Sequence, residues 1–331
     1  MIISKTPYRI SFFGGGTDLP TWYREYGGKV IATTFDKYCY ISARLLPQFF
    51  DHNFRVVYSI IESVKTIDQI KHPSVRETLK YFEIEQGLEI HHDGDLPARS
   101  GLGSSSSFTV GLLNILNSMK GIDSSKSELA SLAIHIEQDL IKESVGSQDQ
   151  VSAAYGGFNE IEFNQDDTFS VNPVMLDPSK SNELNDHLLL FFTGVSRFSS
   201  DISKKQVANM KNCKSQMYDL YEMVDEGLSI LQSNTTPIAE FGKLLHQAWE
   251  VKRSLSDKIS STKINETYET AIKAGALGGK ILGAGGGGFI LFFAKPETHK
   301  RIIAELKDLV HVPFKFESAG SKIVLNYPNG L

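Results

Sequence analysis

The stretch of residues 95–107 combines the residue types that bind a phosphate group. It reads Asp-Leu-Pro-Ala-Arg-Ser-Gly-Leu-Gly-Ser-Ser-Ser-Ser, between a strand-like run at residues 87–92 and a helix-like run at residues 108–119. The unpaired N–H groups and the dipole at the start of a helix attract anions, and glycine lets a phosphate approach the backbone closely. The serines could cap the helix or bind a metal ion. We therefore predict a phosphate-binding loop rather than a plain helix cap.

The loop differs from the Walker type, and this difference points to a metal ion. A Walker loop has a lysine directly after its last glycine, whereas Ser104 follows Gly103 here. Arg99 is the only cation in residues 95–107, so backbone dipoles and a metal must balance most of the phosphate charge. Glu137 is a candidate ligand, because its neighbours one helical turn away are apolar and a carboxylate there must be paired, protonated or metal-bound. The alternative is a solvated glutamate at the edge of an apolar stripe.

A second carboxylate of interest is Asp149. It follows Gly146 in the run Ser147-Gln148-Asp149-Gln150, which predicts a new helix with Ser147 as its cap and Gln150 reaching back to it. The helix dipole favours an ionised carboxylate in the first turn. Asp149 is therefore either a catalytic residue or only a complement to that dipole, and its spacing favours neither.

The composition is typical of a two-domain globular protein from a reducing compartment. The 331 residues exceed the size at which single cores usually split. We place the domains at residues 1–175 and 176–331, with the boundary in the stretch 164–185, which is polar and expected to be a loop. A net charge of -5 argues against nucleic acid as the main partner. Two cysteines cannot build a disulfide framework. Without a signal peptide or an apolar run of about 20 residues, we expect a cytoplasmic protein with no membrane partner.

Strands and helices are expected to alternate along the chain. We predict strands at residues 2–13, 30–34, 38–41, 54–58, 87–92, 158–163 and 187–193. We predict helices at residues 21–26, 73–82, 108–119, 126–143, 199–232, 237–255, 268–273 and 297–309. Near the end, Gly283, Gly285 and Gly288 fit a dinucleotide pattern, but a strand follows where that fingerprint requires a helix. A tight turn between two strands, packed against a large neighbour, is the better interpretation.

Three motifs together resemble the GHMP small-molecule kinases, which include galactokinase, homoserine kinase, mevalonate kinase and phosphomevalonate kinase. Residues 5–18 read KTPYRISFFGGGTD, residues 97–107 read PARSGLGSSSS, and residues 280–289 read KILGAGGGGF. Glu137 and the run containing Asp149 also fall where that family keeps its metal carboxylate and its catalytic aspartate. Each motif alone is a weak signal, but their occurrence in this order is highly specific.

The resemblance implies a two-domain α+β fold, with an N-terminal half like the second domain of ribosomal protein S5 and a ferredoxin-like C-terminal half. ATP and substrate would meet between the halves, with Ser105 and Glu137 holding Mg²⁺. Asp149 would be the base, and Arg9 its partner and the stabiliser of the transferred charge. The residues implied to bind ATP are Pro97, Ala98, Arg99, Ser100, Gly101, Leu102, Gly103, Ser104, Ser105 and Ser106. Those implied to bind the substrate include Gly15, Gly16, Thr17, Asp18, Gly285 and Gly286.

Within the family, residues 8–20 are most similar to the bacterial heptose kinases. These enzymes phosphorylate the anomeric hydroxyl of D-glycero-α-D-manno-heptose 7-phosphate on the way to nucleotide-activated heptose for surface polysaccharide. Galactokinases have a Gly-Glu-His-Thr-Asp type of sequence where this chain has Gly-Gly-Gly-Thr-Asp. A substrate that already carries a phosphate needs a cationic anchor. The candidates are Lys252, Arg253 and Arg197, which could equally lie on a solvated helix face and a loop.

Three other interpretations remain open at this stage. The first is another anomeric sugar kinase, of the fucose or galactose type, with the same chemistry. The second is a non-catalytic sugar sensor of the same fold, against which the intact Ser105, Glu137 and Asp149 argue. The third is a nicotinamide-dependent oxidoreductase, which the strand after Gly288 disfavours.

Overall fold

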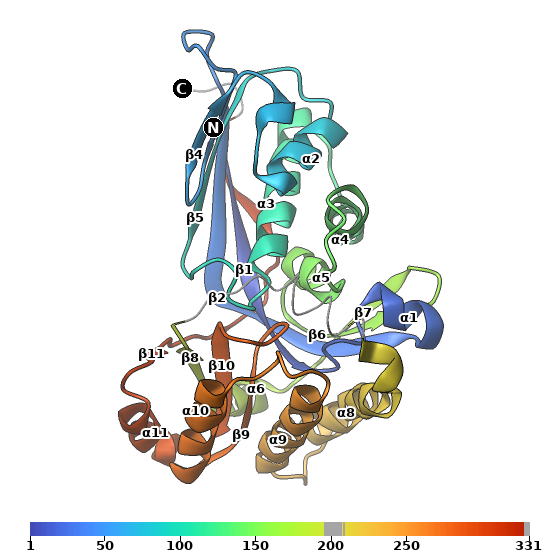
Figure 1. The fold of residues 1–331 in the computed structure, drawn as a ribbon, viewed down its shortest axis with the longest axis vertical. Helices are drawn as coiled ribbons and strands as arrows, with labels where there is room; N and C mark the ends of the chain where they lie inside the picture. Colours follow the sequence, from blue (N-terminus) through green and yellow to red (C-terminus); the bar gives the residue numbers. More distant parts are fainter. Residues whose placement is uncertain (195–206, 208, 328–331) are drawn as a thin grey trace.

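Two β-sheets organise the chain in the computed structural model, which describes residues 1–327 except 195–206 and 208. In Figure 1 the larger sheet stands above the smaller one. The end of the chain returns to the larger sheet, where β13 pairs with β1 and β12 with β2. The two described ends of the chain therefore lie together, and the backbone N–H of Tyr327 donates to the carbonyl of Met1 at 2.8 Å.

The larger sheet has the strand order β13-β1-β2-β5-β3-β4, with β6, β7 and β12 attached beside β2. Within the described residues, its strands are β1 (Ile2–Phe13), β2 (Gly28–Leu45), β3 (Phe54–Val57), β4 (Ile61–Val64), β5 (Leu88–Gly94), β6 (Phe158–Phe163), β7 (Phe169–Pro173), β12 (Phe316–Glu317) and β13 (Lys322–Asn326). All of these strand pairs are antiparallel except β3 with β5.

The long strand β2 replaces the two separate runs that the sequence suggested. It is continuous because its two parts pair with different neighbours, residues 28–33 with β6 and residues 39–45 with β5. The register of β1 against β2 shifts between Pro7 and Tyr8. Such an irregularity bends and twists a strand, and Figure 1 shows β1 and β2 curving toward the smaller sheet.

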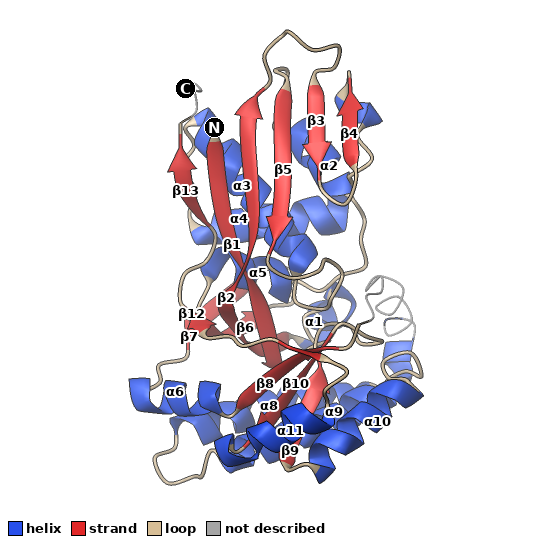
Figure 2. Cartoon of the chain, turned by 90° about the vertical axis from the view of Figure 1, so that its left-hand side faces the viewer, coloured by secondary structure: helices blue, strands red, loops and turns tan. Residues whose placement is uncertain are grey.

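Helices cover one face of the upper part of the larger sheet and leave the other face open, as Figure 2 shows. The helices of this half are α1 (Pro20–Tyr26), α2 (Pro73–Tyr81), α3 (Ser104–Lys120), α4 (Lys126–Ile134) and α5 (Gln148–Tyr155), with a 3₁₀ turn η1 (Ile67–Gln69) and a π-helix η2 (His135–Leu140). The central helix α3 is buried along most of its length. It begins at Ser104 rather than at residue 108, because Gly103 adopts φ 76° at the N-cap and lets the serines form the first turn.

The smaller sheet has the order β11-β8-β10-β9. The elements of this half within the described residues are α6 (Pro178–Asp186), β8 (Leu188–Phe192), η3 (Met210–Asn212), α8 (Lys214–Gln232), α9 (Ala239–Ser254), α10 (Thr262–Lys273), β9 (Ala276–Ile281), β10 (Phe289–Ala294), η4 (Pro296–Thr298), α11 (His299–Glu305) and β11 (Val310–His311). Every residue of β10 is buried, which explains its uninterrupted apolar sequence. The antiparallel pairing of β9 with β10 confirms that the glycine-rich segment between them is a turn between strands.

Several sequence-based expectations for individual elements were wrong. The stretch 164–185 is not a loop but holds β7 and most of α6, and β7 pairs with β6. The helix expected at 126–143 ends as α4 at Ile134 and continues as the π-helix η2 to Leu140. The helix expected at 199–232 is present as α8 only from Lys214, while residues 195–206 and 208 lie outside the described residues. The proposed domain boundary falls between β7 and α6.

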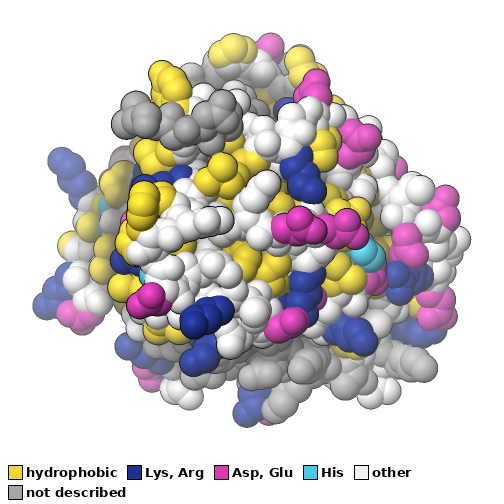
Figure 3. All heavy atoms as spheres, turned by 90° about the horizontal axis from the view of Figure 1, so that it is seen from above, with side chains coloured by type: hydrophobic (Ala, Val, Ile, Leu, Met, Phe, Trp, Pro, Cys, Tyr) yellow, Lys and Arg dark blue, Asp and Glu magenta, His cyan; other side chains and the backbone are white. Residues whose placement is uncertain are grey.

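The surface is mixed in character on the end of the molecule seen in Figure 3. There, Lys and Arg side chains are interspersed with Asp and Glu side chains, and hydrophobic side chains lie between them. In the described part of the chain, none of the helices combines the length and the apolar composition that crossing a membrane requires.

Candidate active site

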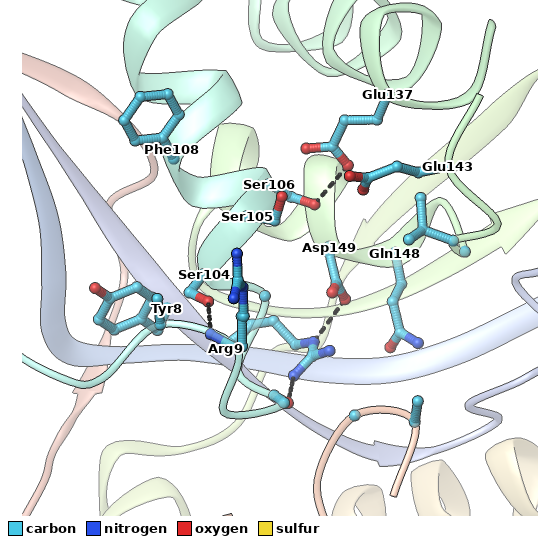
Figure 4. A pocket seen from close by; sticks show the side chains of 18 of the residues that line it. Tyr8, Arg9, Ser104, Ser105, Ser106, Phe108, Glu137, Glu143, Gln148 and Asp149 are labelled. Carbon is cyan, nitrogen blue, oxygen red and sulfur yellow. Dashed lines mark hydrogen bonds and ion pairs between the residues drawn. The ribbon is translucent and has the colours of Figure 1, made fainter. Parts of the chain in front are cut away.

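A cavity of about 780 Å³ collects most of the residues that the sequence analysis selected. Its walls come from both halves of the chain: the end of β1, the loop before α3 and its first turn, the segment between η2 and α5, helix α9, and the turn after β9. Figure 4 shows Arg9, Asp149, Ser105, Ser106, Glu137 and Glu143 facing this space. The strands of the two sheets thus bring together motifs that are far apart in the sequence.

The glycine-rich loop before α3 forms one wall and packs directly on the second glycine-rich segment. A Cβ atom at Gly101 would lie 2.4 Å from the carbonyl oxygen of Leu282, and one at Gly283 would lie 2.6 Å from the Cα atom of Gly101. The backbone N–H of Phe289 also donates to the carbonyl of Ser100 at 3.1 Å. The large neighbour expected for the second glycine-rich turn is therefore the first glycine-rich loop.

Arg9 links this loop to Asp149. Its Nε donates to Oδ1 of Asp149 at 2.7 Å, and its Nη1 donates to the carbonyl of Gly101 at 2.6 Å. Arg9 is 3% exposed, whereas the Asp149 side chain is 26% exposed toward the cavity. A Cβ atom at Gly103 would contact the Asp149 carboxylate at 3.4 Å, so the start of α3 lies beside the same carboxylate. One guanidinium thus holds a cavity-facing carboxylate against the loop.

Asp18 lines the same cavity as Asp149 and is held by backbone donors. Its Oδ1 accepts from the N–H of Gly16 at 2.8 Å, and its Oδ2 accepts from the N–H of Gln148 at 3.4 Å. Burial raises the pKa of Asp18, and the negative charge of Asp149 adds to this effect. A Cβ atom at Gly146 would lie 1.9 Å from Oδ2 of Asp18. Gly146 therefore leaves room for Asp18, and it does not end a helix as expected, since η2 has already ended at Leu140.

Two buried lysines add positive charge to the same end of the cavity. Lys252, in the last turn of α9, donates from Nζ to the carbonyl of Gly283. Lys280 donates from Nζ to the carbonyl of Phe12 at 2.6 Å. Burial, helped by the positive charge of Arg9, lowers the pKa of Lys252 to about 8. Burial and the nearby Lys252 also lower the pKa of Lys280. An anionic ligand at this end would stabilise both ammonium groups.

Glu137 is buried against the first turn of α3. Its Oε2 accepts a hydrogen bond from Oγ of Ser106 at 2.9 Å and another from Nε2 of Gln150. Its Oε1 is buried and has no hydrogen-bond partner among the described residues. Burial raises the pKa of Glu137 to about 7, and the negative charge of Glu143 contributes. The π-helix η2 presents this carboxylate to the cavity, which agrees with the frequent occurrence of π-helices at functional sites.

The oxygen atoms around Glu137 fit a magnesium ion that is completed by phosphate. Mg²⁺ prefers oxygen ligands and is usually held by one or two carboxylates together with substrate phosphates. The unpartnered Oε1 of Glu137 and the hydroxyl of Ser106 meet this requirement. Ser105, the expected partner of Glu137, is exposed and lines the cavity. The described residues contain no group of three or more His, Cys, Asp and Glu side chains that could hold a metal alone.

Several residues that the sequence analysis assigned to the substrate lie elsewhere or serve the fold. The Thr17 hydroxyl donates within the protein to the carbonyls of Gly14 and Lys29, at 2.8 and 2.9 Å. Arg253 pairs with Glu250 at 2.6 Å and does not line the cavity. Gly285 and Gly286 pack on Ile259 instead of lining the cavity. Arg197 lies outside the described residues.

The predicted capping box at the start of α5 is also wrong. The side chain of Ser147 caps no N–H group of α5 and instead accepts a hydrogen bond from Gln138 at 3.0 Å. The side chain of Gln150 bonds to Glu137 rather than reaching back to Ser147. Both side chains therefore connect α5 to the π-helix, a contact that no local sequence pattern announces.

Sequence reasoning missed several charged residues of the cavity, including Lys280 and Glu143. Lys280 lies in the apolar strand β9, and a lysine within a buried strand is the signal that could have revealed it. Glu143 follows η2 and reaches the cavity only because of the turn at Lys142, so no periodic pattern contains it. An aromatic wall at the other end of the cavity was also missed: His72 stacks on Phe108 with ring centroids 4.6 Å apart.

Comparison with known proteins identifies the family. The family model described as GHMP kinases N terminal domain matches residues 68–157, and that of the GHMP kinases C terminal matches residues 231–311, together just over half of the chain. D-glycero-alpha-D-manno-heptose 7-phosphate kinase of Campylobacter jejuni is 28% identical over 92% of this chain and 93% of its own length. The L-fucokinase/L-fucose-1-P guanylyltransferase of Bacteroides fragilis is 26% identical, over 91% of this chain but only 35% of that longer protein.

Solved structures show the same fold. A D-glycero-D-manno-heptose 1-phosphate kinase from Bacteroides thetaiotaomicron superposes with a TM-score of 0.80 at 24% identity, covering 99% of this chain and 100% of that one. Lactococcus lactis galactokinase gives a TM-score of 0.74 at 18% identity, covering 97% of this chain and 94% of that one. The two-domain α+β fold expected from the motifs is thereby confirmed. This chain belongs to the GHMP kinases, ATP-dependent phosphotransferases that use an alcohol group as the acceptor.

Proposed function

We propose that the protein is a sugar kinase that phosphorylates the anomeric hydroxyl of D-glycero-α-D-manno-heptose 7-phosphate. The product would be the 1,7-bisphosphate, for the synthesis of nucleotide-activated heptose in the cytoplasm, where ATP is the donor. The Campylobacter jejuni heptose kinase, which matches along nearly the whole chain, supports this acceptor. The Arg9–Asp149 pair carries the proposal that the cavity is catalytic, because it places a carboxylate and a guanidinium at the glycine-rich loop.

Asp149 is proposed to take the proton of the anomeric hydroxyl as that oxygen attacks the γ-phosphorus of ATP. The new bond joins the anomeric oxygen to phosphorus, the bond between the γ-phosphorus and the bridging oxygen breaks, and ADP leaves with the electron pair. Such transfers pass through a loose transition state, so positioning and charge stabilisation matter more than strong basicity. Arg9 would hold the Asp149 carboxylate in place and stabilise charge on the transferred group.

The loop of residues 97–103 and the first turn of α3 are proposed to bind the ATP phosphates. The helix dipole and the N–H groups of this turn favour bound anions. Glu137 and the hydroxyls of Ser105 and Ser106 would hold Mg²⁺ there. When bound, Mg²⁺ neutralises phosphate charge and orients the phosphate chain. The purine base would occupy the aromatic wall that contains His72 and Phe108.

The acceptor is proposed to bind at the opposite end, between Asp18 and the two buried lysines. Asp18, with Gly15 and Gly16, lines the cavity there and could accept hydrogen bonds from sugar hydroxyls. Of the three cations proposed as anchors for a substrate phosphate, Lys252 lines the cavity. Among the described residues the buried ammonium of Lys252 bonds to the carbonyl of Gly283 and feels the negative charges of Asp18 and Asp149. A phosphorylated sugar would add a directly bound anion.

A fucose-type acceptor is the second candidate. The Bacteroides fragilis fucokinase part matches 91% of this chain at an identity close to that of the heptose kinase. Fucose carries no phosphate, so the two acceptors differ in the charge that they bring to Lys252. A catalytically inactive sugar sensor is a third, weaker alternative, which requires Asp149 to have no chemical role.

Steady-state turnover distinguishes these proposals. The purified protein with Mg-ATP is assayed on heptose 7-phosphate, on the same heptose without its phosphate, on L-fucose, on D-galactose and on mevalonate. We expect kcat/KM to be highest for heptose 7-phosphate, and at least a hundredfold lower for the unphosphorylated heptose. Preferential turnover of fucose or galactose would show that the protein is a sugar kinase with a different acceptor. ATP binding without turnover of any acceptor would support the sensor.

A further inference from the structure

The segment after the π-helix brings a second carboxylate to the buried face of Glu137. Glu143 lines the same cavity as Glu137 and Ser106, and Figure 4 shows the side chains of all three directed into it. The negative charge of Glu143 also helps to raise the pKa of Glu137, after the larger effect of burial. Two carboxylates that face one another at the phosphate loop repel each other unless a cation lies between them.

The backbone fixes this placement. The N–H of Glu143 donates to the carbonyl of Glu137 at 2.9 Å, and the N–H of Ile141 donates to the carbonyl of Ile136 at 2.9 Å. Between these two bonds, Lys142 adopts the left-handed conformation with φ 63°, which a residue other than glycine rarely adopts. The chain therefore reverses after η2 and turns Glu143 back over the cavity. The same left-handed turn ends η2, because the N–H of Glu143 satisfies a carbonyl of its last turn.

A buried oxygen atom points to the ligand that these carboxylates take. Oε1 of Glu137 has no hydrogen-bond partner in the described part of the chain, although Glu137 is only 1% exposed. The nearby hydroxyl of Thr109 also acts on this carboxylate, but it donates to the carbonyl of Ser105 at 3.2 Å. Leaving a charged oxygen buried and unpaired is costly, so such an atom is expected to meet a cation. Ser106, which bonds to the other oxygen of Glu137, adds a further oxygen ligand next to the loop.

We propose that Glu143 is a second carboxylate ligand of the divalent cation that accompanies ATP, opposite Glu137. The proposal rests on the proposed kinase function, in which Glu137 is the first such ligand. Mg²⁺ is commonly bound by one or two carboxylates together with substrate phosphates. A second carboxylate would balance the charge of the divalent ion and would fix this ion relative to the start of α3. Arg99 is the only cationic side chain in residues 95–107.

Manganese binding tests the proposal without any sugar. Mn²⁺ replaces Mg²⁺ in the presence of a non-hydrolysable ATP analogue, and free Mn²⁺ is measured by electron paramagnetic resonance. We expect Glu143→Gln to weaken Mn²⁺ binding at least tenfold, as expected for the loss of a ligand, and to add one water molecule to the bound ion. The matched control is Glu85→Gln, an exposed glutamate away from the cavity, which should leave both values unchanged.

The result that overturns the proposal is Mn²⁺ affinity within twofold of the native protein and an unchanged number of bound waters. The Arg99 guanidinium also acts electrostatically on Glu143. If Glu143 only held Arg99 in place, Glu143→Gln would weaken nucleotide binding without changing the hydration of Mn²⁺. That result would also contradict the proposal. Because the measurement uses nucleotide alone, a wrong sugar acceptor would abolish turnover of heptose 7-phosphate but leave the manganese result intact.

Two substitutions at Lys142 separate the placement of the carboxylate from its presence. Lys142→Gly keeps the left-handed turn and should preserve Mn²⁺ affinity, because glycine adopts this conformation readily. Lys142→Val strains it, since β-branched residues avoid a positive φ, and should weaken Mn²⁺ binding although Glu143 is retained. Equal Mn²⁺ affinity in the two variants would contradict the role of the turn. Thermal melting of each variant shows that the fold is intact.

Discussion

The guanidinium of Arg9 lies 2.7 Å from the carboxylate of Asp149, and this pair joins the end of β1 to the first turn of α5 across the cavity. The same guanidinium holds the glycine-rich loop through the carbonyl of Gly101. The loop, the carboxylate and the cation are therefore positioned by one side chain. A change at Arg9 should disturb the loop and the carboxylate together.

Removing the carboxylate tests the role proposed for Asp149. We expect Asp149→Asn to lower kcat by about 10²–10⁴-fold, the usual contribution of a positioned proton acceptor, while the affinity for ATP stays near that of the native protein. Stopped-flow or coupled assays give kcat, and calorimetry gives the nucleotide affinity. The control is Asp123→Asn, at an exposed aspartate. Near-normal kcat in Asp149→Asn would remove Asp149 from the mechanism.

The geometry of Arg9 predicts that lysine cannot replace it. Arg9 uses two nitrogen atoms in fixed directions, toward Asp149 and toward Gly101, whereas lysine has a single compact ammonium. Arg9→Lys should lower kcat by more than tenfold and reduce the free energy of unfolding by about 1–3 kcal/mol, because a buried acceptor loses its donor. Urea unfolding and steady-state kinetics measure the two effects. Full activity of Arg9→Lys would show that only the charge matters.

The contact between the two glycine-rich segments can be tested with matched glycines. Gly101 and Gly121 both have left-handed backbones, with φ 82° and 66°, but a Cβ atom clashes only at Gly101. Gly121→Ala should cost about 1–2 kcal/mol of folding free energy from the backbone alone. Gly101→Ala should cost about 1–3 kcal/mol more through overpacking, and it should raise the KM for ATP. Equal destabilisation by the two substitutions would mean that the loops are free to separate.

Burial of Glu137 predicts a pH-dependent stability of the protein without metal. The folded state raises the pKa of Glu137 from 4.5 to about 7, so folding favours the protonated carboxyl. The stability associated with this proton is complete below about pH 4.5 and is lost as the pH rises through 7, by about 1.4 kcal/mol per pH unit at most. Glu137→Gln should flatten this part of the curve. Unfolding by urea at several pH values, with a chelator present, measures the slope.

Adding the divalent cation and ATP should reverse the loss of stability with rising pH, because the ionised form of Glu137 then gains a partner. A stability curve of the metal-free native protein that is flat between pH 4.5 and 7, or one that Glu137→Gln leaves unchanged, would show that Glu137 is not the group responsible.

Lys252 predicts a second pH effect, on the binding of an anionic acceptor. Burial lowers the pKa of Lys252 to about 8, so its ammonium loses its proton above that pH. Because kcat/KM reports the ionisation of the free enzyme, its value for heptose 7-phosphate should fall above pH 8. Lys252→Arg should move this fall to higher pH, since arginine stays charged. A profile that stays flat to pH 9.5 in the native protein would exclude Lys252 as the anchor.

The sequence predicted those parts of the fold that local patterns determine. The strands β1 and β6 were predicted from their strand-like residues, and the glycine turn between β9 and β10 was identified because the apolar strand β10 followed it. The start of α3 at Ser104 was missed, because the left-handed backbone of Gly103 has no side-chain signature. The pairing of β13 with β1 could not be predicted either, since pairing between the two ends of a chain depends on long-range topology.

The candidate site was predicted in part, for similar reasons. The resemblance to the GHMP kinases singled out Arg9 and Asp149 as partners, and the structure pairs them. Thr17 was selected as a substrate contact, but its hydroxyl bonds to internal carbonyls, which only the folded loop reveals. The position of Glu143 in the cavity depends on the turn at Lys142. A strained backbone conformation at a residue other than glycine cannot be predicted from composition or periodicity.

The position of the new phosphate on the sugar shows whether the protein is a heptose 1-kinase. The protein is incubated with Mg-ATP and D-glycero-α-D-manno-heptose 7-phosphate, and ³¹P NMR follows the new phosphate signal, with Asp149→Asn as the control. We expect a second phosphate ester coupled to the anomeric proton, formed by the native protein and absent from the variant. A phosphate on any other hydroxyl, or ADP formation without a sugar bisphosphate, would contradict it.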